Sequence, residues 1–446
     1  MIFLITILVI IILGFLMKSK NSENPFFIWM FNFIWICIYI IYLLNKSSVS
    51  LMNISETYVQ FTISIFIISM NLGFLLFNKP VKNEIEGRID IDSYVLNKNK
   101  FYVFLIVLFI LLLIIYKESI PLVLSGNLGA IRDSIYGTEL GSQGSLYSSG
   151  IESIFVYWFI DSMLIAIDIV LVSSYMKTKE NFSVALFAIL VTTTSEILKG
   201  GRMTILKAVI IILISLYGIN HYRIFRFDKF KKSVYIRKRL NGFLIVILML
   251  TLSVAIVTFV RNLSLQTDMG VFQTISVYLF SPIKYYNVLL DYNIPWMSFL
   301  YGGGFFGGIL RIIYLIANNL GEFPFWYQFE QVMSVETSTF LEISPGQRYN
   351  AFPTMLYHFY RDGGVFGIIV DSLILTFIIM FLYKNYKQKL NLKSESFLLL
   401  SLYVLFFGSF RWEPGTYEPW FASLYIPILT SKLFLTKKMK KEESHD

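Results

Sequence analysis

The sequence predicts an all-α polytopic integral membrane protein, and three observations support that class. The 446 residues are 56% hydrophobic and only 15% charged, a balance too apolar for a soluble domain of this length. The apolar residues form runs long enough to cross a bilayer, which takes about 20 helical residues. Within these runs polar and apolar residues do not alternate as they do in barrel strands. We therefore expect a bundle of membrane-spanning helices and no soluble domain.

Eleven apolar runs follow one another along the chain. Two further segments, 271–290 and 299–316, raise the expected number of spans to thirteen if they also cross the membrane. The hydropathy divides the chain into an N-terminal bundle (1–260), a large external segment (261–362) that follows the eighth span, and a C-terminal part (363–446) with a basic cytoplasmic tail. The eleven runs are 2–17, 26–44, 59–77, 101–116, 154–175, 182–198, 203–219, 242–260, 365–383, 397–410 and 420–435.

The distribution of basic residues predicts the orientation of these spans. Loops after the first, third, fifth, seventh and ninth runs are rich in Lys and Arg, as is the C-terminal tail. Basic loops stay in the cytoplasm, which places the N-terminus outside and the C-terminus inside. The net charge of +9 is then an insertion signal and calls for no nucleic-acid partner. No basic residue precedes the first run, so we expect a retained anchor rather than a cleaved signal peptide.

The densest group of polar residues lies in the stretch 346–371, just before the ninth run. It contains Arg348, Asn350, His358, Arg361 and Asp362. If 352–360 is a short helix, residues 350, 354, 358, 361 and 362 lie near one face, because helical neighbours are three or four positions apart. The Gly363-Gly364 pair then ends this helix before the span begins. An amphipathic helix facing lipid headgroups is the simpler alternative.

A second set of cations lies on the side that the topology rule leaves poor in basic residues. Arginine binds phosphate through a planar pair of donors, and glycine lets backbone amides approach an anion. We therefore predict an anion site on the outer face, with solvated rim charges as the alternative. The turn Gly200-Gly201-Arg202 is the strongest single candidate. The cations are Arg132, Arg202, Lys284, Arg311, Arg348 and Arg361, with Arg261 and Arg411 as further candidates.

Candidate acids and bases also gather near this face. Glu196 lies six residues before Arg202, and Asp161, Asp168 and Asp371 lie inside predicted spans. Carboxylates within a membrane often have a function, although pairing inside the bundle is the alternative. His358 is the outer-face histidine, and a neutral imidazole can act as a base near pH 7. No nucleotide, zinc or serine-hydrolase motif is present, so we expect neither a metal nor a cofactor.

These features resemble the Wzy-type oligosaccharide repeat-unit polymerases, which build O-antigen and capsular polysaccharides in bacteria. The resemblance rests on the turn 200–203 between two spans, on the outer segment that ends in 350–354 and 359–364, and on Arg132. It implies a GT-C-like fold in the cytoplasmic membrane. It further implies a glycosyltransferase that needs no metal or nucleotide sugar. The partners implied are undecaprenyl-pyrophosphate-linked oligosaccharides, the lipid bilayer, a flippase and a chain-length regulator.

The residues and this resemblance together give an expected division of roles. His358, Asp362 and Glu196 are the candidate catalytic bases, and Arg202, Arg348 and Arg361 form the expected pyrophosphate clamp. A lipid-linked oligosaccharide flippase, an O-antigen-type ligase and a non-enzymatic scaffold are the rival interpretations. The full set expected to bind pyrophosphate or sugar is Arg132, Gly200, Gly201, Arg202, Arg348, Asn350, Tyr357 and Arg361.

Overall fold

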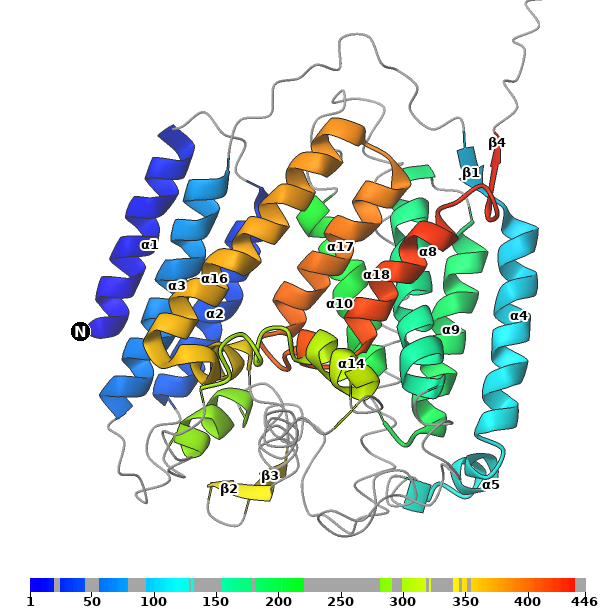
Figure 1. Ribbon diagram of the computed structural model, residues 1–446, viewed down its shortest axis with the longest axis horizontal. Coiled ribbons are helices and arrows are strands. Elements are labelled where there is room, and N and C mark those ends of the chain that lie inside the picture. Colours follow the sequence, from blue (N-terminus) through cyan, green and yellow to red (C-terminus); the bar gives the residue numbers. More distant parts are fainter. Residues whose placement is uncertain are drawn as a thin grey trace, which may run out of the picture.

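The computed structural model is dominated by α-helices that run side by side (Figure 1). The predicted eighth run, 242–260, lies outside the residues that the structure describes, as do Arg132 and Arg202. Only the backbone is described for Arg348 and Asn350. The described residues are 1–19, 25–44, 56–78, 94–127, 130–131, 155–178, 181–201, 203–219, 281–290, 299–317, 321, 340–344, 347–350 and 354–437.

Nine of the predicted runs coincide wholly or largely with helices in the described part of the chain. Six helices there are long and apolar enough to cross a membrane, and two shorter apolar helices accompany them. The chain is therefore a largely α-helical integral membrane protein, as predicted. The helices are α1 (Ile2–Ser19), α2 (Phe26–Leu44), α3 (Glu56–Phe77), α4 (Lys98–Ile115), α8 (Ser162–Thr178) after a π-helical turn (Phe155–Asp161), α9 (Phe182–Leu198), α10 (Met203–Leu213) with a π-helical continuation (Ile214–Ile219), α16 (Met355–Lys389) and α17 (Leu392–Phe407).

The last predicted run, 420–435, is too long. Helix α18 covers Glu418–Leu429 and stops there, because the chain turns and residues 435–437 form a strand. This strand, β4 (Leu435–Lys437), pairs antiparallel with β1 (Tyr94–Leu96), which supplies its backbone hydrogen bonds. Hydropathy alone does not reveal this end, because a short apolar strand and the last turn of a helix have the same composition.

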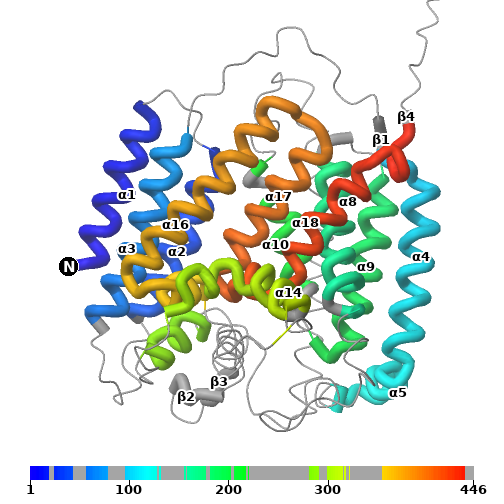
Figure 2. Tube along the Cα trace, in the orientation of Figure 1, coloured from blue at the N-terminus to red at the C-terminus, as the bar shows by residue number. Residues whose placement is uncertain are grey.

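Packing places α16 across α3 and α18 against α8, so the C-terminal helices fill the middle of the bundle (Figures 1 and 2). Aromatic side chains such as Phe31, Trp35 and Phe66 are fully buried between α2 and α3. Only 22% of the residues of α1, and 22% of those of α4, are buried, so both helices lie at the periphery. Their exposed Leu, Ile, Phe and Val side chains suit a hydrocarbon environment rather than water.

The connections gather at two opposite ends of the bundle (Figure 1). One end holds β1 and β4, and also the turn between α16 and α17. The other end holds α5 (Ser119–Leu124), α14 (Gly307–Ala317) and the hairpin β2–β3 (Phe340–Ser344, Gln347–Asn350). Helix α14 runs across the ends of the bundle helices rather than alongside them. Segments with predicted basic loops thus share one end, and predicted outer segments share the other.

The predicted break at Gly363-Gly364 is confirmed. Helix α16 begins at Met355, and both glycines interrupt it with non-helical torsion angles. Gly364 has φ 61° and ψ −138°, a conformation that favours glycine. A methyl group on Gly367 would lie 2.4 Å from the Phe359 carbonyl oxygen, so the helix before the break packs closely over the helix after it. Asp362, immediately before the break, binds the backbone of Gly304 and Phe305, just before α14.

Candidate functional site

Three segments that lie far apart in the sequence meet at the α14 end of the bundle: the Gly-rich segment (residues 299–311), the start of α16, and the 411–418 loop. Asp362 joins the first two, because its carboxylate oxygens accept the N–H groups of Gly304 and Phe305 at 2.6 and 2.7 Å. Trp412 joins the third, since its indole N–H donates to the Gly304 carbonyl oxygen at 3.0 Å. The meeting point is therefore held by directed hydrogen bonds as well as apolar packing.

Glycine is required in the Gly-rich segment because the backbones approach so closely. A methyl group at Gly304 would lie 2.4 Å from the His358 carbonyl oxygen. At Gly308 it would lie 1.9 Å from the Thr416 carbonyl oxygen. Both distances are below van der Waals contact with backbone atoms that cannot rotate away. The glycines thus let the 299–311 segment lie directly against α16 and the 411–418 loop.

His358 is at the centre of this meeting point and is 4% exposed. Its Nδ1 is buried and makes no hydrogen bond to any residue in the described part of the chain. Three arginines act on it electrostatically: Arg311 from α14, Arg361 from α16 and Arg411 from the 411–418 loop. We call Arg311, Arg361 and Arg411 the arginine cluster. Arg361 is buried, whereas Arg311 and Arg411 are partly exposed and so form the accessible side of the cluster.

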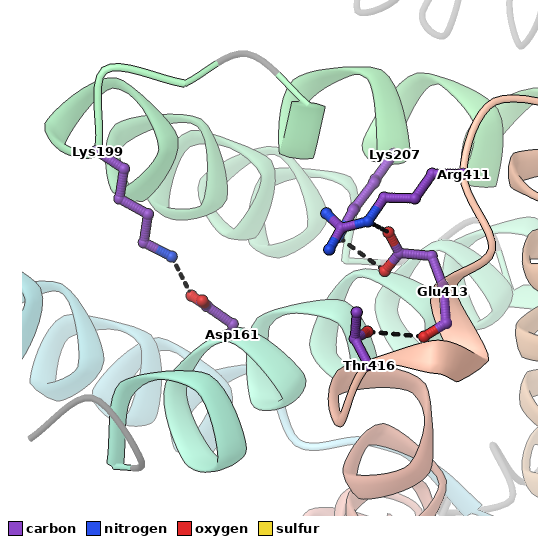
Figure 3. Close-up of polar contacts among 6 residues, drawn as sticks. All are labelled: Asp161, Lys199, Lys207, Arg411, Glu413 and Thr416. Atoms are coloured by element: carbon purple, nitrogen blue, oxygen red, sulfur yellow. Dashed lines mark hydrogen bonds and ion pairs between the residues drawn. The ribbon is translucent and has the colours of Figure 1, made fainter. Parts of the chain in front are cut away.

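Arg411 belongs to a second group of charges, drawn in Figure 3. Glu413 is fully buried, and its Oε2 lies 3.0 Å from Nζ of Lys207 on α10. Its Oε1 lies 3.6 Å from Arg411 Nε. Burial by itself raises the pKa of Glu418, which begins α18, but the charges of Lys207 and Arg411 outweigh it and lower that pKa below its usual value. The charges of Lys207 and Arg411 therefore favour the ionised form of Glu418.

A third pair lies close to this group. Lys199, at the end of α9, forms an ion pair with Asp161 on the π-helical turn (Figure 3). Lys207 and Glu418 also act electrostatically on Asp161. Beside the pair, the Gly201 N–H donates to the Glu196 carbonyl oxygen at 3.0 Å and closes the turn into α10. Charged groups thus continue from the arginine cluster to the turn at 200–201 along one end of the bundle.

The structure brings together part of the predicted site. His358, Arg361 and Asp362 lie in one place, and Tyr357 is buried beside them with its ring edge-on to Tyr286. Glu196, Gly200 and Gly201 lie in the α9–α10 turn next to Lys199. Asp362 holds two backbone amides, so its geometry favours an anchoring role over that of a base. Arg132, Arg202 and the side chains of Arg348 and Asn350 lie outside the described residues, so the clamp of Arg202, Arg348 and Arg361 stays a prediction.

The site residues expected from the sequence did not include Lys207, Glu413 or Glu418. Lys207 lies in a run that the hydropathy assigns to a span, and Glu413 and Glu418 lie in a short loop more than 200 positions later. The available signal was a lysine inside an apolar run, which implies an acidic partner in the bundle. The identity of that partner depends on how α10 packs against α17 and the 411–418 loop, and a single sequence does not contain it.

No protein-family model matches the chain, and neither the curated proteins nor the solved structures gave a match. Among the described residues, no group of three or more His, Cys, Asp or Glu side chains is arranged to hold a metal ion. Fold and site together define a helical membrane protein with a cationic cluster at one end of its bundle.

Proposed function

We propose that this chain is a glycosyltransferase that joins undecaprenyl-pyrophosphate-linked oligosaccharide units into a surface polysaccharide on the outer face of a bacterial cytoplasmic membrane. The observation that carries the proposal is the arginine cluster: three arginines from separate segments act electrostatically on one buried histidine. The proposal includes a GT-C-like arrangement of eleven spans, with the N-terminus outside and the C-terminus in the cytoplasm.

The chemistry requires cations where a pyrophosphate leaves. In the proposed step, a hydroxyl oxygen of the acceptor unit forms a bond to the anomeric carbon of the donor. The bond from that carbon to the pyrophosphate oxygen breaks, and the pyrophosphate keeps the electron pair. Guanidinium groups stabilise this developing charge through planar, charge-assisted hydrogen bonds. Arg311 and Arg411 are partly exposed, so they make the first contacts with the pyrophosphate. Arg361 is buried and adds a third positive charge.

The hydroxyl proton needs an acceptor, and His358 fits this role better than the other two candidates. Asp362 already binds two amide groups through its carboxylate. Glu196 lies at the α9–α10 turn, where its carboxylate folds over Gly201. The three arginines of the cluster act electrostatically on His358, and its Nδ1 makes no hydrogen bond among the described residues. Because the ring is buried, the acceptor reaches Nδ1 only after the side chains above it move.

Deleting the gene in its source strain separates this proposal from its rivals. Loss of a polymerase leaves single repeat units on the lipid carrier or at the surface, without long polymer. Loss of a ligase leaves long polymer on the lipid carrier, because only the final acceptor differs. Loss of a flippase traps units on the cytoplasmic leaflet. Either of the last two outcomes would replace the proposed activity.

Substitutions in the arginine cluster test the site itself. A charge-assisted hydrogen bond contributes about 1.5–3 kcal/mol, so losing one arginine should slow polymerisation at least about tenfold. We expect this for Arg311→Ala, Arg361→Ala and Arg411→Ala, with only partial recovery in the lysine variants, which lack the planar fork. Polymer length and rate are measured at matched protein levels, with exposed Lys432→Ala at the other end as control. If all three alanine variants make normal polymer, the three arginines are solvated charges at the rim of the site and do not bind pyrophosphate.

A further inference from the structure

We propose that Glu413, which forms an ion pair with Lys207, is a positioning residue that orients Arg411 toward the pyrophosphate. This inference rests on the proposed function only in assigning a phosphate contact to Arg411. Glu413 reaches two cations at once: Lys207 Nζ at 3.0 Å through Oε2 and Arg411 Nε at 3.6 Å through Oε1 (Figure 3). It therefore links a rigid bundle helix to a partly exposed arginine.

The backbone around Glu413 is held firmly. Thr416 donates both its N–H and its hydroxyl to the Glu413 carbonyl oxygen, each at 2.7 Å, which closes a single 3₁₀ turn (Glu413–Gly415). On the other side, buried Trp412 is fixed between Phe305 and Phe359 and donates to Gly304. The main chain on which Arg411 sits is thus fixed, and the ion pair with Glu413 directs its long side chain.

Charge explains why Lys207 is needed behind Glu413. A buried carboxylate without a partner is strongly unfavourable, and a single nearby cation would be drawn fully onto it. Lys207 is itself buried and faces Oε2, so it neutralises much of the charge of Glu413. Arg411 meets the other carboxylate oxygen through a longer contact, 3.6 Å from its Nε. A bidentate phosphate contact commonly uses the terminal nitrogens of a guanidinium, which lie farther along the side chain.

The position of Arg411 connects this pair to the arginine cluster. Arg411 acts electrostatically on His358, and a methyl group at Gly415 would lie 3.8 Å from Cε1 of the same ring. The Glu413 turn therefore borders the site directly. Lys207 and Glu413 need not contact the substrate themselves: they act through Arg411, and their loss should resemble the loss of that arginine.

The test uses the purified full chain in detergent and inorganic pyrophosphate as the probe, with binding read from thermal stabilisation. Single removal of either charge leaves a buried ion, so the main variant is the neutral pair Lys207→Met/Glu413→Gln. We expect it to weaken pyrophosphate binding about tenfold, as Arg411→Ala does. Adding Arg411→Ala to the neutral pair should change binding by less than about twofold, because residues acting as one unit are not additive. Lys432→Ala is the control.

Several results would overturn this inference. If the neutral pair binds pyrophosphate with wild-type affinity, Lys207 and Glu413 have only structural roles and the inference is overturned. The same holds if the losses of affinity in the neutral pair and in Arg411→Ala add fully when the substitutions are combined. Absence of pyrophosphate binding in the wild-type chain would overturn it as well. If the neutral pair does not fold, Glu413→Asp is used, which keeps the charge but shortens its reach. The same tenfold loss is expected, and unchanged binding overturns the inference.

The proposed function fails separately from this inference. If pyrophosphate binding follows the pattern above but gene deletion leaves polymer length unchanged, the positioning pair stands and the polymerase activity falls. If Arg411→Ala abolishes polymer while the neutral pair makes polymer at the wild-type rate and binds pyrophosphate normally, the polymerase stands and the positioning role falls.

Discussion

At the scale of single residues, the site depends on glycines that let another backbone approach closely. Gly308 is the clearest case, because a methyl group there would lie 1.9 Å from the Thr416 carbonyl oxygen and 2.6 Å from the Trp420 ring. Gly321, after the end of α14, provides a contrast, since a methyl group there meets no described residue within 4 Å. The two positions separate the effect of contact from the general effect of replacing glycine.

We therefore predict opposite outcomes for the two alanine variants. Gly308→Ala should push α14 off the 411–418 loop and destabilise the protein by about 1–3 kcal/mol, the usual range for overpacking. Gly321→Ala should leave stability within about 0.5 kcal/mol of wild type. Thermal unfolding in detergent measures both, and pyrophosphate binding reports on the arginine cluster. Equal stability of the two variants would show that α14 is free to shift.

At the scale of elements, the break in α16 decides where its polar residues point. The first two turns carry His358, Arg361 and Asp362, and α16 contacts α3 both before the break, through Phe359, and after it, through Phe377. An unbroken α16 would continue those residues along the bundle axis. Gly364, with φ 61°, makes the change of direction possible.

Substitution at the break should show this dependence. Gly364→Ala forces an alanine into a conformation that disfavours side chains, at a cost of about 1–3 kcal/mol. Gly363→Ala is the matched control, because its φ of 170° is extended and a methyl group there meets nothing within 4 Å in the described part of the chain. We expect Gly364→Ala to lower both the unfolding temperature and polymer yield, and Gly363→Ala to lower neither. If both variants behave alike, the break is not set by the glycine conformation.

At the scale of the whole molecule, the two ends of the bundle differ in the kind of charge they carry. One end bears exposed lysines beside β1 and β4, such as Lys98, Lys100 and Lys432. The other bears the arginine cluster and buried ion pairs. The positive-inside rule assigns the lysine end to the cytoplasm and leaves the arginine cluster on the outer face.

Cysteine labelling tests that assignment. Cys37 is the one cysteine of the chain, so a Cys37→Ser background accepts single new cysteines. Tyr301→Cys and Leu124→Cys, at positions 81% and 83% exposed, should react with an impermeant maleimide added to intact cells. Leu433→Cys, at a position 60% exposed, should react only after the cells are permeabilised. Labelling of residue 433 but not 301 in intact cells would invert the orientation and remove the site from the outer face.

Local patterns predicted the features of this protein that depend on neighbours along the chain. Apolar runs gave the class and nine helices with small errors at their ends, because the bilayer and the helix geometry together fix the length of a span. Two consecutive glycines gave the break in α16. The density of polar groups around His358 and Arg361 marked a region where the structure brings distant segments together, since such groups are rare in so apolar a chain.

Tertiary packing alone decided which distant residues act together. The partner of Lys207 is Glu413, 206 positions away, and the amides that hold Asp362 come from Gly304 and Phe305. A sequence records residue types and short spacings, but not which of several acids a buried lysine reaches after the helices pack. The physical reason is that an ion pair depends on distances of a few ångströms between side chains. Those distances exist only once α10, α14, α16 and the 411–418 loop have met.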